Sequence, residues 1–250
     1  CNHCPLTREY PKSFIDNSKF NFRLKKKLFC ANKNLHLVTV SHWLANFVNE
    51  SFLKNTKIDV INNGIDLNIF YPQVIKKDTM FIILGVASIW NSSKGLNDFY
   101  ELRKRLSNDY KFVLVGLTKE QIKELPDGIE GYMRTNSISK LVQMYALADV
   151  FVNPTYADSF PTVNLEALAC GKPVITYRTG GSPEAVDETT GVIVEQGDIE
   201  GLVEAKKKIK TGENVFSPEN CRRRAELYFN KEQRFNDYIL LYEKILGMNN

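Results

Sequence analysis

From about residue 35 onward, the sequence alternates between short apolar runs and amphipathic stretches. The apolar runs are rich in Val, Ile and Leu without strict polar alternation, which is typical of strands buried on both faces of a parallel sheet. Short connections between the two kinds of segment predict an open α/β sheet with right-handed crossovers. The expected strands are 35–40, 57–61, 80–87, 111–116, 149–153, 173–177 and 191–194, and the expected helices are 43–52, 96–106, 138–148, 160–170 and 199–209.

A turn-rich segment interrupts this alternation at residues 62–72, and we interpret it as a domain boundary or hinge. Before it lie one clear βα unit and a strand, whereas a complete run of βα units follows it. The chain of 250 residues is too long for one domain of roughly 150 residues and short for two. We therefore expect a partial first domain (1–61), a linker (62–72), a complete second domain (73–230) and a last helix (231–250).

The C-terminal segment predicts two helices and no strand. Ser217 is a favourable N-cap, and Pro218 suits the first helical position after it. The second helix carries one apolar stripe that is expected to pack on another surface. The residues of this stripe are Phe235, Ile239, Tyr242 and Leu246. The basic runs 206–208 and 222–224 are interpreted as solvated faces.

Composition excludes several classes of protein. Lys and Arg exceed Asp and Glu by 33 to 29, and a net charge of +4 is too mild to indicate a nucleic-acid partner. The sequence has neither a signal-peptide pattern nor an apolar run near the ~20 residues that span a bilayer. Five scattered cysteines indicate a reducing cytoplasm, and a first residue other than Met indicates a piece of a longer chain. Cys1, His3 and Cys4 have the spacing of half a zinc site, and the favoured interpretation is that they bind no metal.

The loop after the expected strand 80–87 is a candidate phosphate site. It is polar, carries Lys94 and Gly95, and enters a helix, so backbone N–H groups and the positive end of the helix dipole would face a ligand. Gly95 would let a ligand approach the backbone. The glycine spacing differs from a P-loop, and the alternative is a solvated turn lysine at a helix start.

Two further loops follow expected strands. In the first, Asp158 precedes a helix that carries Glu166 among small and apolar neighbours. A carboxylate buried there needs hydrogen-bond donors, and the vicinal hydroxyls of a ribose would supply them. The alternatives are a capping role for Asp158, shared with Ser159, and a partly exposed position for Glu166. In the second loop, Gly180 and Gly181 permit close backbone contact, and Ser182-Pro183 predicts a helix start.

These elements resemble retaining glycosyltransferase family 4. Asp158 and Glu166, with seven residues between them, resemble the E-x7-E signature of that family, and residues 180–184 resemble the element that follows it. Residues 60–72 resemble its interdomain linker, and Ser93-Lys94-Gly95 its diphosphate loop. The resemblance runs from about residue 35 to the C-terminus, and it is greatest to bacterial enzymes of capsule, O-antigen (lipopolysaccharide) or exopolysaccharide assembly.

The resemblance implies a GT-B fold, with two Rossmann-like domains, of which this chain would hold part of the N-terminal, acceptor-side domain and all of the C-terminal one. The last helix would return to the N-terminal domain. Glu166 would hold the ribose hydroxyls, Asp158 the sugar hydroxyls, and Lys94, with Gly95 beside it, the departing diphosphate. No metal or other cofactor is implied, because Lys94 and helix N-termini supply the positive charge. Further donor-binding residues would be Arg134 and Thr135 at the base, and Phe160, Pro161 and Thr162 at the sugar and phosphate.

The sequence departs from the family pattern at two places. The first acid of the signature is Asp158 and not Glu, so its carboxylate reaches one methylene less. The usual Arg before the Lys-Gly pair is absent, so Lys94 would have to stabilise more of the phosphate charge unless another basic residue substitutes. The basic stretch 23–29 is favoured as a solvated face, and its alternative is contact with anionic lipid, which would suit a lipid-linked acceptor.

The predicted function is transfer of a hexose from a UDP- or GDP-sugar, with retention of configuration, to a glycan or lipid-linked acceptor in bacterial surface polysaccharide synthesis. The expected location is the cytoplasm, with the inner face of the cell membrane as an alternative, and residues 1–61 are candidates for self-association. One rival is a nucleotide-sugar-binding module that is catalytically incomplete. A second rival, a GT-B phosphorylase or epimerase, lacks a clear pyridoxal-phosphate lysine or acid–base set.

Overall fold

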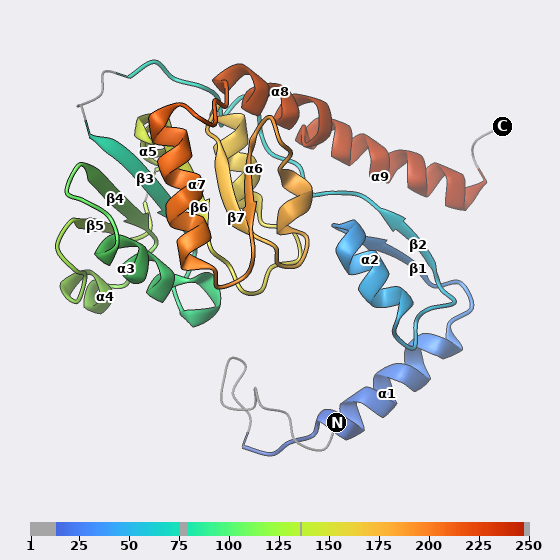
Figure 1. Cartoon of the computed structure of the whole chain (residues 1–250). Helices are drawn as coiled ribbons and strands as arrows, with labels where there is room; N and C mark the ends of the chain where they lie inside the picture. Colours follow the sequence, from blue (N-terminus) through green and yellow to red (C-terminus); the bar gives the residue numbers. More distant parts are fainter. Residues whose placement is uncertain (1–13, 76–79, 136, 248–250) are drawn as a thin grey trace. The chain divides into compact units, whose positions relative to one another are not determined.

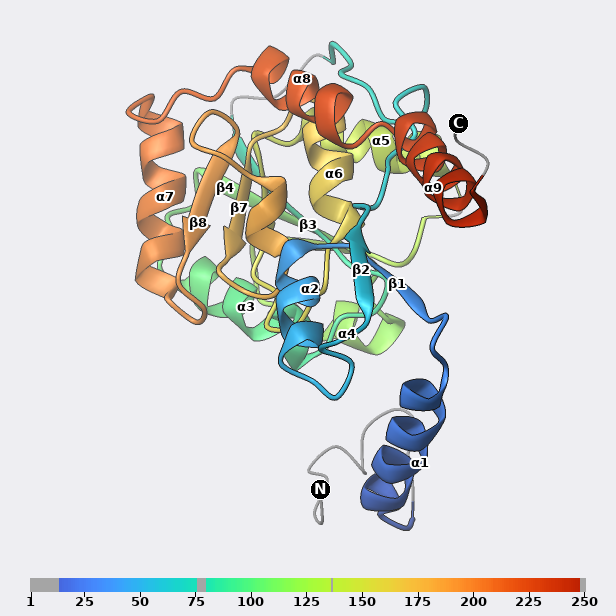
Figure 2. The same cartoon turned by 90° about the vertical axis from the view of Figure 1, so that its right-hand side faces the viewer.

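Two units, which divide between Val60 and Ile61, make up the chain in the computed structural model, and the structure describes residues 14–75, 80–135 and 137–247. In the first unit, α1 (Ser18–Ala31) precedes β1 (His36–Thr39), α2 (His42–Asn49) and β2 (Lys57–Val60). β1 and β2 pair in parallel and α2 lies beside them (Figure 2). The Ser41 hydroxyl caps α2 by accepting from the Leu44 N–H at 3.1 Å. The helix α1 was not predicted, and none of its residues is buried.

A six-stranded parallel sheet forms the centre of the second unit, in the order β5-β4-β3-β6-β7-β8 (Figure 1). Its strands are β3 (Phe81–Val86), β4 (Tyr110–Val115), β5 (Ile129–Tyr132), β6 (Val150–Asn153), β7 (Val174–Tyr177) and β8 (Gly191–Val194). The predicted α/β class and parallel sheet are confirmed. The edge strand β5 was missed, because four residues with Gly131 among them give no buried apolar run.

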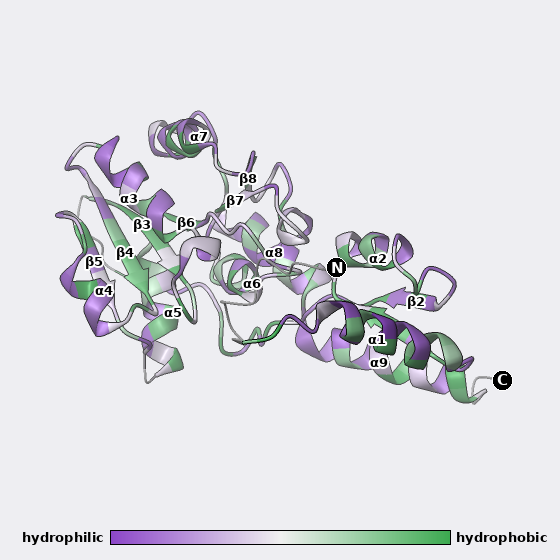
Figure 3. Ribbon diagram, turned by 90° about the horizontal axis from the view of Figure 1, so that it is seen from below, coloured by the Kyte–Doolittle hydropathy of each residue, from purple (hydrophilic) through white to green (hydrophobic). Residues whose placement is uncertain are grey.

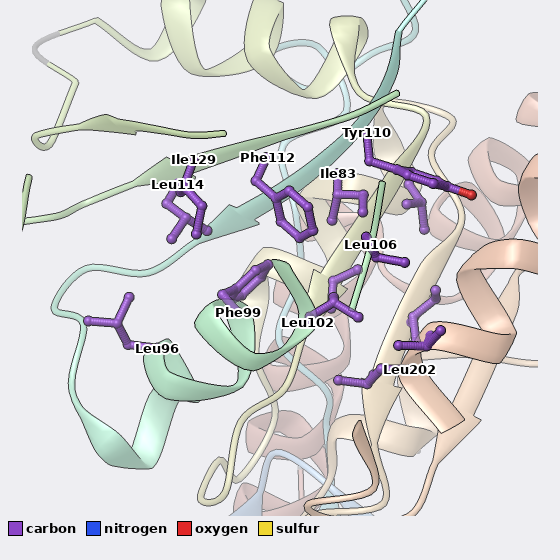
Figure 4. Packing of buried hydrophobic residues seen from close by; sticks show 14 of the residues in the cluster. Ile83, Leu96, Phe99, Leu102, Leu106, Tyr110, Phe112, Leu114, Ile129 and Leu202 are labelled. Carbon is purple, nitrogen blue, oxygen red and sulfur yellow. The ribbon is translucent and has the colours of Figure 1, made fainter. Parts of the chain in front are cut away.

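Helices cover both faces of this sheet, with α3 and α7 on one face and α5, α6 and α8 on the other (Figure 3). On the first face, Ile83, Phe99 and Phe112 are fully buried and lie close together between α3 and the strands (Figure 4). Two buried faces explain why the strands lack polar alternation. The helices of this unit are α3 (Leu96–Lys104), α4 (Lys119–Lys123), α5 (Ile138–Leu147), α6 (Thr162–Ala169), α7 (Ile199–Thr211), α8 (Pro218–Tyr228) and α9 (Lys231–Leu246).

The segment that was predicted to be a linker is bound to the C-terminal helices. The Ile65 N–H donates to Phe229 O at 2.7 Å, and the Lys231 N–H donates back to Ile65 O at 3.1 Å. The Arg222 guanidinium donates to the carbonyls of Leu67 and Phe70 at 3.2 and 2.7 Å. Residues 62–72 thus belong structurally to the second unit, although their sequence is rich in turns.

Two basic runs that were predicted to be solvated are solvated only in part, because Lys207 and Arg223 are exposed whereas other members are not. In the run 222–224, Arg222 and Arg224 donate to backbone carbonyls, and Arg224 also pairs with Asp187. In the run 206–208, Lys206 is fully buried, with its Nζ 3.3 Å from the centroid of the Tyr110 ring. The prediction was wrong for Lys206, Arg222 and Arg224 because a charge run on a helix does not show which of its members face the rest of the protein.

The C-terminal helices differ in how much they bury. The predicted start at Ser217 is confirmed, since its hydroxyl accepts from the Asn220 N–H at 3.0 Å. Leu241 is the residue that α9 buries, whereas the stripe of Phe235, Ile239, Tyr242 and Leu246 is 54–71% exposed. What this stripe packs on stays a prediction. The helix predicted from Ser182 is a 3-10 turn of four residues, Ser182–Ala185.

Candidate functional site

A cavity of about 440 Å³ opens at the carboxyl ends of the central strands of the second unit. It lies where the order of the strands reverses, because β3, β4 and β5 follow one another toward one edge and β6 returns to the other side of β3. This reversal leaves a crevice that is the usual ligand site of an open parallel sheet. Val86, Ala87 and Ser88 line the cavity from β3 and the loop after it, and Asn153 lines it from the end of β6.

Lys94 reaches this cavity from the loop after β3. The loop forms a 3-10 turn at Ser92–Lys94, in which the Asn91 side chain accepts from the Lys94 N–H at 3.1 Å. Gly95 follows with a φ of 74°, and a Cβ at this position would lie 2.2 Å from Pro154 O. Gly95 is not among the residues that line the cavity, and its conformation and its contact with the neighbouring loop both require a glycine. The approach of a ligand to its backbone stays a prediction.

Asp158 also lines the cavity and lies in contact with Lys94. Its Oδ2 is 2.7 Å from the Lys94 Nζ, and its Oδ1 accepts from the Phe160 N–H at 3.2 Å. Pro161 is the N-cap residue of α6, so Asp158 makes a local turn and does not cap the helix. Gly180 is needed here, because its φ is 56° and a Cβ would lie 1.8 Å from Asp158 O. The structure therefore places a carboxylate and an ammonium group in contact beside one cavity.

Glu166 lies at the inner wall of the cavity, on the second turn of α6. Its Oε2 accepts from the Tyr145 hydroxyl of α5 at 2.8 Å. Burial raises the pKa of Glu166 to about 7, although the Tyr145 hydroxyl opposes the shift. The sequence predicted a need for donors to this carboxylate but missed Tyr145, which is fully buried on the inner face of α5. The remaining acceptor capacity of the carboxylate is available to a ligand.

A buried polar network behind the cavity connects the ends of β6 and β7 with α6 and the 3-10 turn at Ser182. Asn153 donates to the Asn164 side chain at 2.9 Å, and Asn164 donates to the Ser182 hydroxyl at 3.0 Å. The Ser182 and Thr176 hydroxyls are 2.6 Å apart, and Thr176 donates to Asn153 O at 3.0 Å. Sequence reasoning missed this network, which joins α6 to the ends of β6 and β7. A closed network of this kind holds its members in one arrangement.

The other predicted residues also lie at the cavity, and they are Arg134, Thr135, Phe160, Pro161 and Thr162. Arg134 and Lys94 are the basic residues among those that line it. Within the described part of the chain, no three His, Cys, Asp or Glu side chains cluster in a way that could hold a metal ion. Cys1, His3 and Cys4 lie outside the described residues, so the suggested half-site for zinc stays a prediction.

Comparison with known proteins defines the class of this fold and site. The family model for glycosyl transferases group 1 matches residues 80–210, and the chain belongs to this family. The fold is GT-B: Alr3699/HepE of Anabaena in complex with UDP and glucose matches 90% of the chain with a TM-score of 0.74 at 18% sequence identity, and 67% of that structure is covered.

Two curated relatives come from bacteria. The N,N'-diacetylbacillosaminyl-diphospho-undecaprenol alpha-1,3-N-acetylgalactosaminyltransferase of Campylobacter jejuni is 33% identical over 57% of this chain, and the match covers 42% of its own length. The capsular polysaccharide biosynthesis glycosyltransferase CapM of Staphylococcus aureus is 24% identical over 89% of this chain and is covered over 64% of its length. The chain thus spans less than two thirds of either relative. Among the described residues, no helix has the length and apolarity that a membrane crossing requires.

Proposed function

We propose that the cavity of the second unit binds a nucleotide sugar, UDP- or GDP-linked, and that the chain is the donor-binding part of a retaining hexosyltransferase. The observation that carries this proposal is the convergence of Lys94, Asp158 and Glu166 on one cavity at the switch point of a parallel sheet. One cation and two carboxylates suit a diphosphate flanked by hydroxyl-bearing rings. The complex of Alr3699/HepE with UDP and glucose supports this class of ligand, since the two folds match.

Each cavity residue has a chemical role in this proposal. Lys94 stabilises the negative charge that develops on the departing diphosphate, and this positive charge serves in place of a metal ion. Glu166 accepts from the ribose hydroxyls with the oxygens that Tyr145 leaves free. Asp158 accepts from hydroxyls of the sugar while it keeps Lys94 in place. Arg134 is the second basic residue at the cavity and is our candidate to replace the arginine that the family motif would carry.

Arg134 and Thr135 lie beside the position proposed for the base, and Phe160, Pro161 and Thr162 face the sugar and phosphates. The acceptor in this proposal is a glycan or a lipid-linked glycan of bacterial surface polysaccharide synthesis. Support comes from the two curated relatives, one named for a diphospho-undecaprenol substrate and the other for capsular polysaccharide biosynthesis. We place the reaction in the cytoplasm, at the inner face of the membrane where such an acceptor would reside. Self-association through the first unit is a further part of the proposal.

The alternative is a binding module that holds the donor without transferring its sugar. The observation that favours it is the length of the chain, which covers 42% and 64% of the two relatives. Binding of a nucleotide is common to both proposals, whereas only the transferase converts a donor sugar. Assays of sugar release and transfer, on this chain and on a form extended to the length of the relatives, separate the two.

Isothermal titration of the chain with UDP and GDP tests the site. We expect one of the two nucleotides to bind, and Glu166→Ala to weaken it by ~1–3 kcal/mol through loss of a charged hydrogen-bond partner. Lys94→Ala should weaken the binding of the nucleoside diphosphate more than the binding of the matching nucleoside. Lys207→Ala, at an exposed position of α7, is the matched control. A folded protein that binds neither nucleotide would overturn the proposal.

A further inference from the structure

Asp98 is a buried carboxylate that the proposed donor site does not use. It lies in the first turn of α3, among core residues of that helix, and its side chain is only 8% exposed. Aspartate is almost never this buried without a partner, because removing a charge from water is costly. Burial raises the pKa of Asp98, consistent with this unfavourable position. The groups that contact Asp98 therefore need to be identified.

The hydrogen-bond partner of Asp98 comes from the loop after β6. The Tyr156 hydroxyl donates to Asp98 Oδ1 at 3.2 Å. The Tyr156 ring also packs edge-on against Tyr177 at the end of β7, with 5.6 Å between the ring centroids. Asp98 Oδ2 and the Tyr177 hydroxyl are both buried, and the Tyr177 hydroxyl, like that of Tyr156, opposes the rise that burial causes in the pKa of Asp98. The Tyr156 hydroxyl is thus the group that donates a hydrogen bond to this carboxylate in the described part of the chain.

The backbone of Tyr156 joins the two loops that carry the proposed donor-binding charges. Its N–H donates to Ser93 O at 2.8 Å, and the Thr155 hydroxyl donates to the same oxygen at 3.3 Å. Ser93 immediately precedes Lys94, and Tyr156 lies two residues before Asp158. The Lys94–Asp158 ion pair therefore spans the same two segments as the Asp98–Tyr156 hydrogen bond. One bridge faces the cavity and the other, whose residues do not line it, lies away from it.

We propose that Asp98 is a positioning residue, which acts through the Tyr156 hydroxyl to hold the loop of Asp158 against the loop of Lys94. The ion pair alone is partly exposed, so water and salt weaken it. A buried anchor four residues after Lys94 keeps the two loops together when a ligand competes for the lysine. The loops then need less ordering upon binding, which lowers the entropic cost of holding a diphosphate. This last consequence rests on the proposed function, whereas the bracing of the loops does not.

Hydrogen exchange of the unliganded chain tests the brace by itself. Tyr156→Phe removes the donor and keeps the ring, so we expect faster exchange in peptides covering residues 91–95 and 154–159. Asp98→Asn keeps an acceptor for the Tyr156 hydroxyl and should retain the protection, whereas Asp98→Ala should lose it. Tyr242→Phe, on an exposed face of α9, is the matched control. Exchange in Tyr156→Phe that equals exchange in the wild type would overturn the proposal.

Nucleotide affinity tests the consequence for the site. We expect Tyr156→Phe to lower the affinity for UDP by about fivefold or more and to leave the affinity for uridine unchanged. The loss for UDP is the size expected when a hydrogen bond to a charged group is removed. GDP and guanosine serve as the pair if GDP is the nucleotide that binds. An equal loss of affinity for the nucleotide and for the nucleoside would overturn the positioning role. If the wild type binds neither UDP nor GDP, the proposed function fails, and the exchange experiment alone decides the brace.

Discussion

Replacing Glu166 by Gln should stabilise the second unit, and the gain should grow as the pH rises. The pKa of Glu166 is raised from 4.5 to about 7 in the folded protein, chiefly by burial. Between these two values the folded state binds more protons than the unfolded state, so the stability of the wild type falls as the pH rises through this window. Glutamine does not titrate, and its amide oxygen still accepts from the Tyr145 hydroxyl. The variant therefore escapes this loss.

The size of the effect follows from the two pKa values. At about 1.36 kcal/mol per pH unit, the interval from 4.5 to about 7 corresponds to a loss of about 3 kcal/mol above the window. Part of this stability has already been lost at pH 5, and solvent screens the partly exposed side chain, so both effects reduce the figure. We therefore expect the difference in unfolding free energy between variant and wild type to grow by about 2 kcal/mol from pH 5 to pH 8.

Urea unfolding at pH 5, 6, 7 and 8 measures this difference. The chain has two tryptophans, and Trp90 is buried in the second unit whereas Trp43 lies on α2 of the first. A Trp43→Phe background therefore makes the fluorescence of Trp90 report on the second unit alone. Glu188→Gln, at an exposed position of the same unit, is the matched control. A difference between Glu166→Gln and the wild type that stays constant from pH 5 to pH 8 would show that burial of this carboxylate is not what we describe.

Three further predictions concern the same unit. Tyr145→Phe removes the hydroxyl that opposes the shift, so the pKa of Glu166 should rise further, and the midpoint of the pH-dependent loss in urea unfolding should move up. An unmoved midpoint would contradict the role of Tyr145. Burial lowers the pKa of Lys206 from 10.5 to about 7, so the unfolded state binds more protons and wild-type stability should rise between these values. Lys206→Met should remove that rise in thermal melts, and an identical pH profile would refute the account. Asp158→Asn removes the anionic partner of Lys94, so the charge of the lysine is left to pair with the diphosphate, and UDP affinity, measured by titration, should become more sensitive to salt; an unchanged salt dependence would contradict the pairing.

The pattern of apolar runs predicted most of the second unit. Strands such as β3 and β6 are recognisable because burial on both faces requires continuous apolar residues, whatever the rest of the chain does. The carboxyl ends of parallel strands share one edge, so loops far apart in the sequence were expected to meet there. Lys94 and Asp158 lie 64 positions apart and are in contact. Elements that bury little, namely α1, α4 and β5, escaped prediction because they carry no such pattern.

The sequence by itself determined the fold class and the set of charged residues at the strand ends, since periodicity and the order of motifs are local properties of the chain. Only the tertiary structure decided what each of these residues touches. Tyr145 as the donor to Glu166, Pro154 as the reason for Gly95, and the burial of Lys206 depend on distances between segments that are distant in sequence. Hydrogen bonds and close packing are decided within fractions of an ångström, and residue spacing does not carry that information.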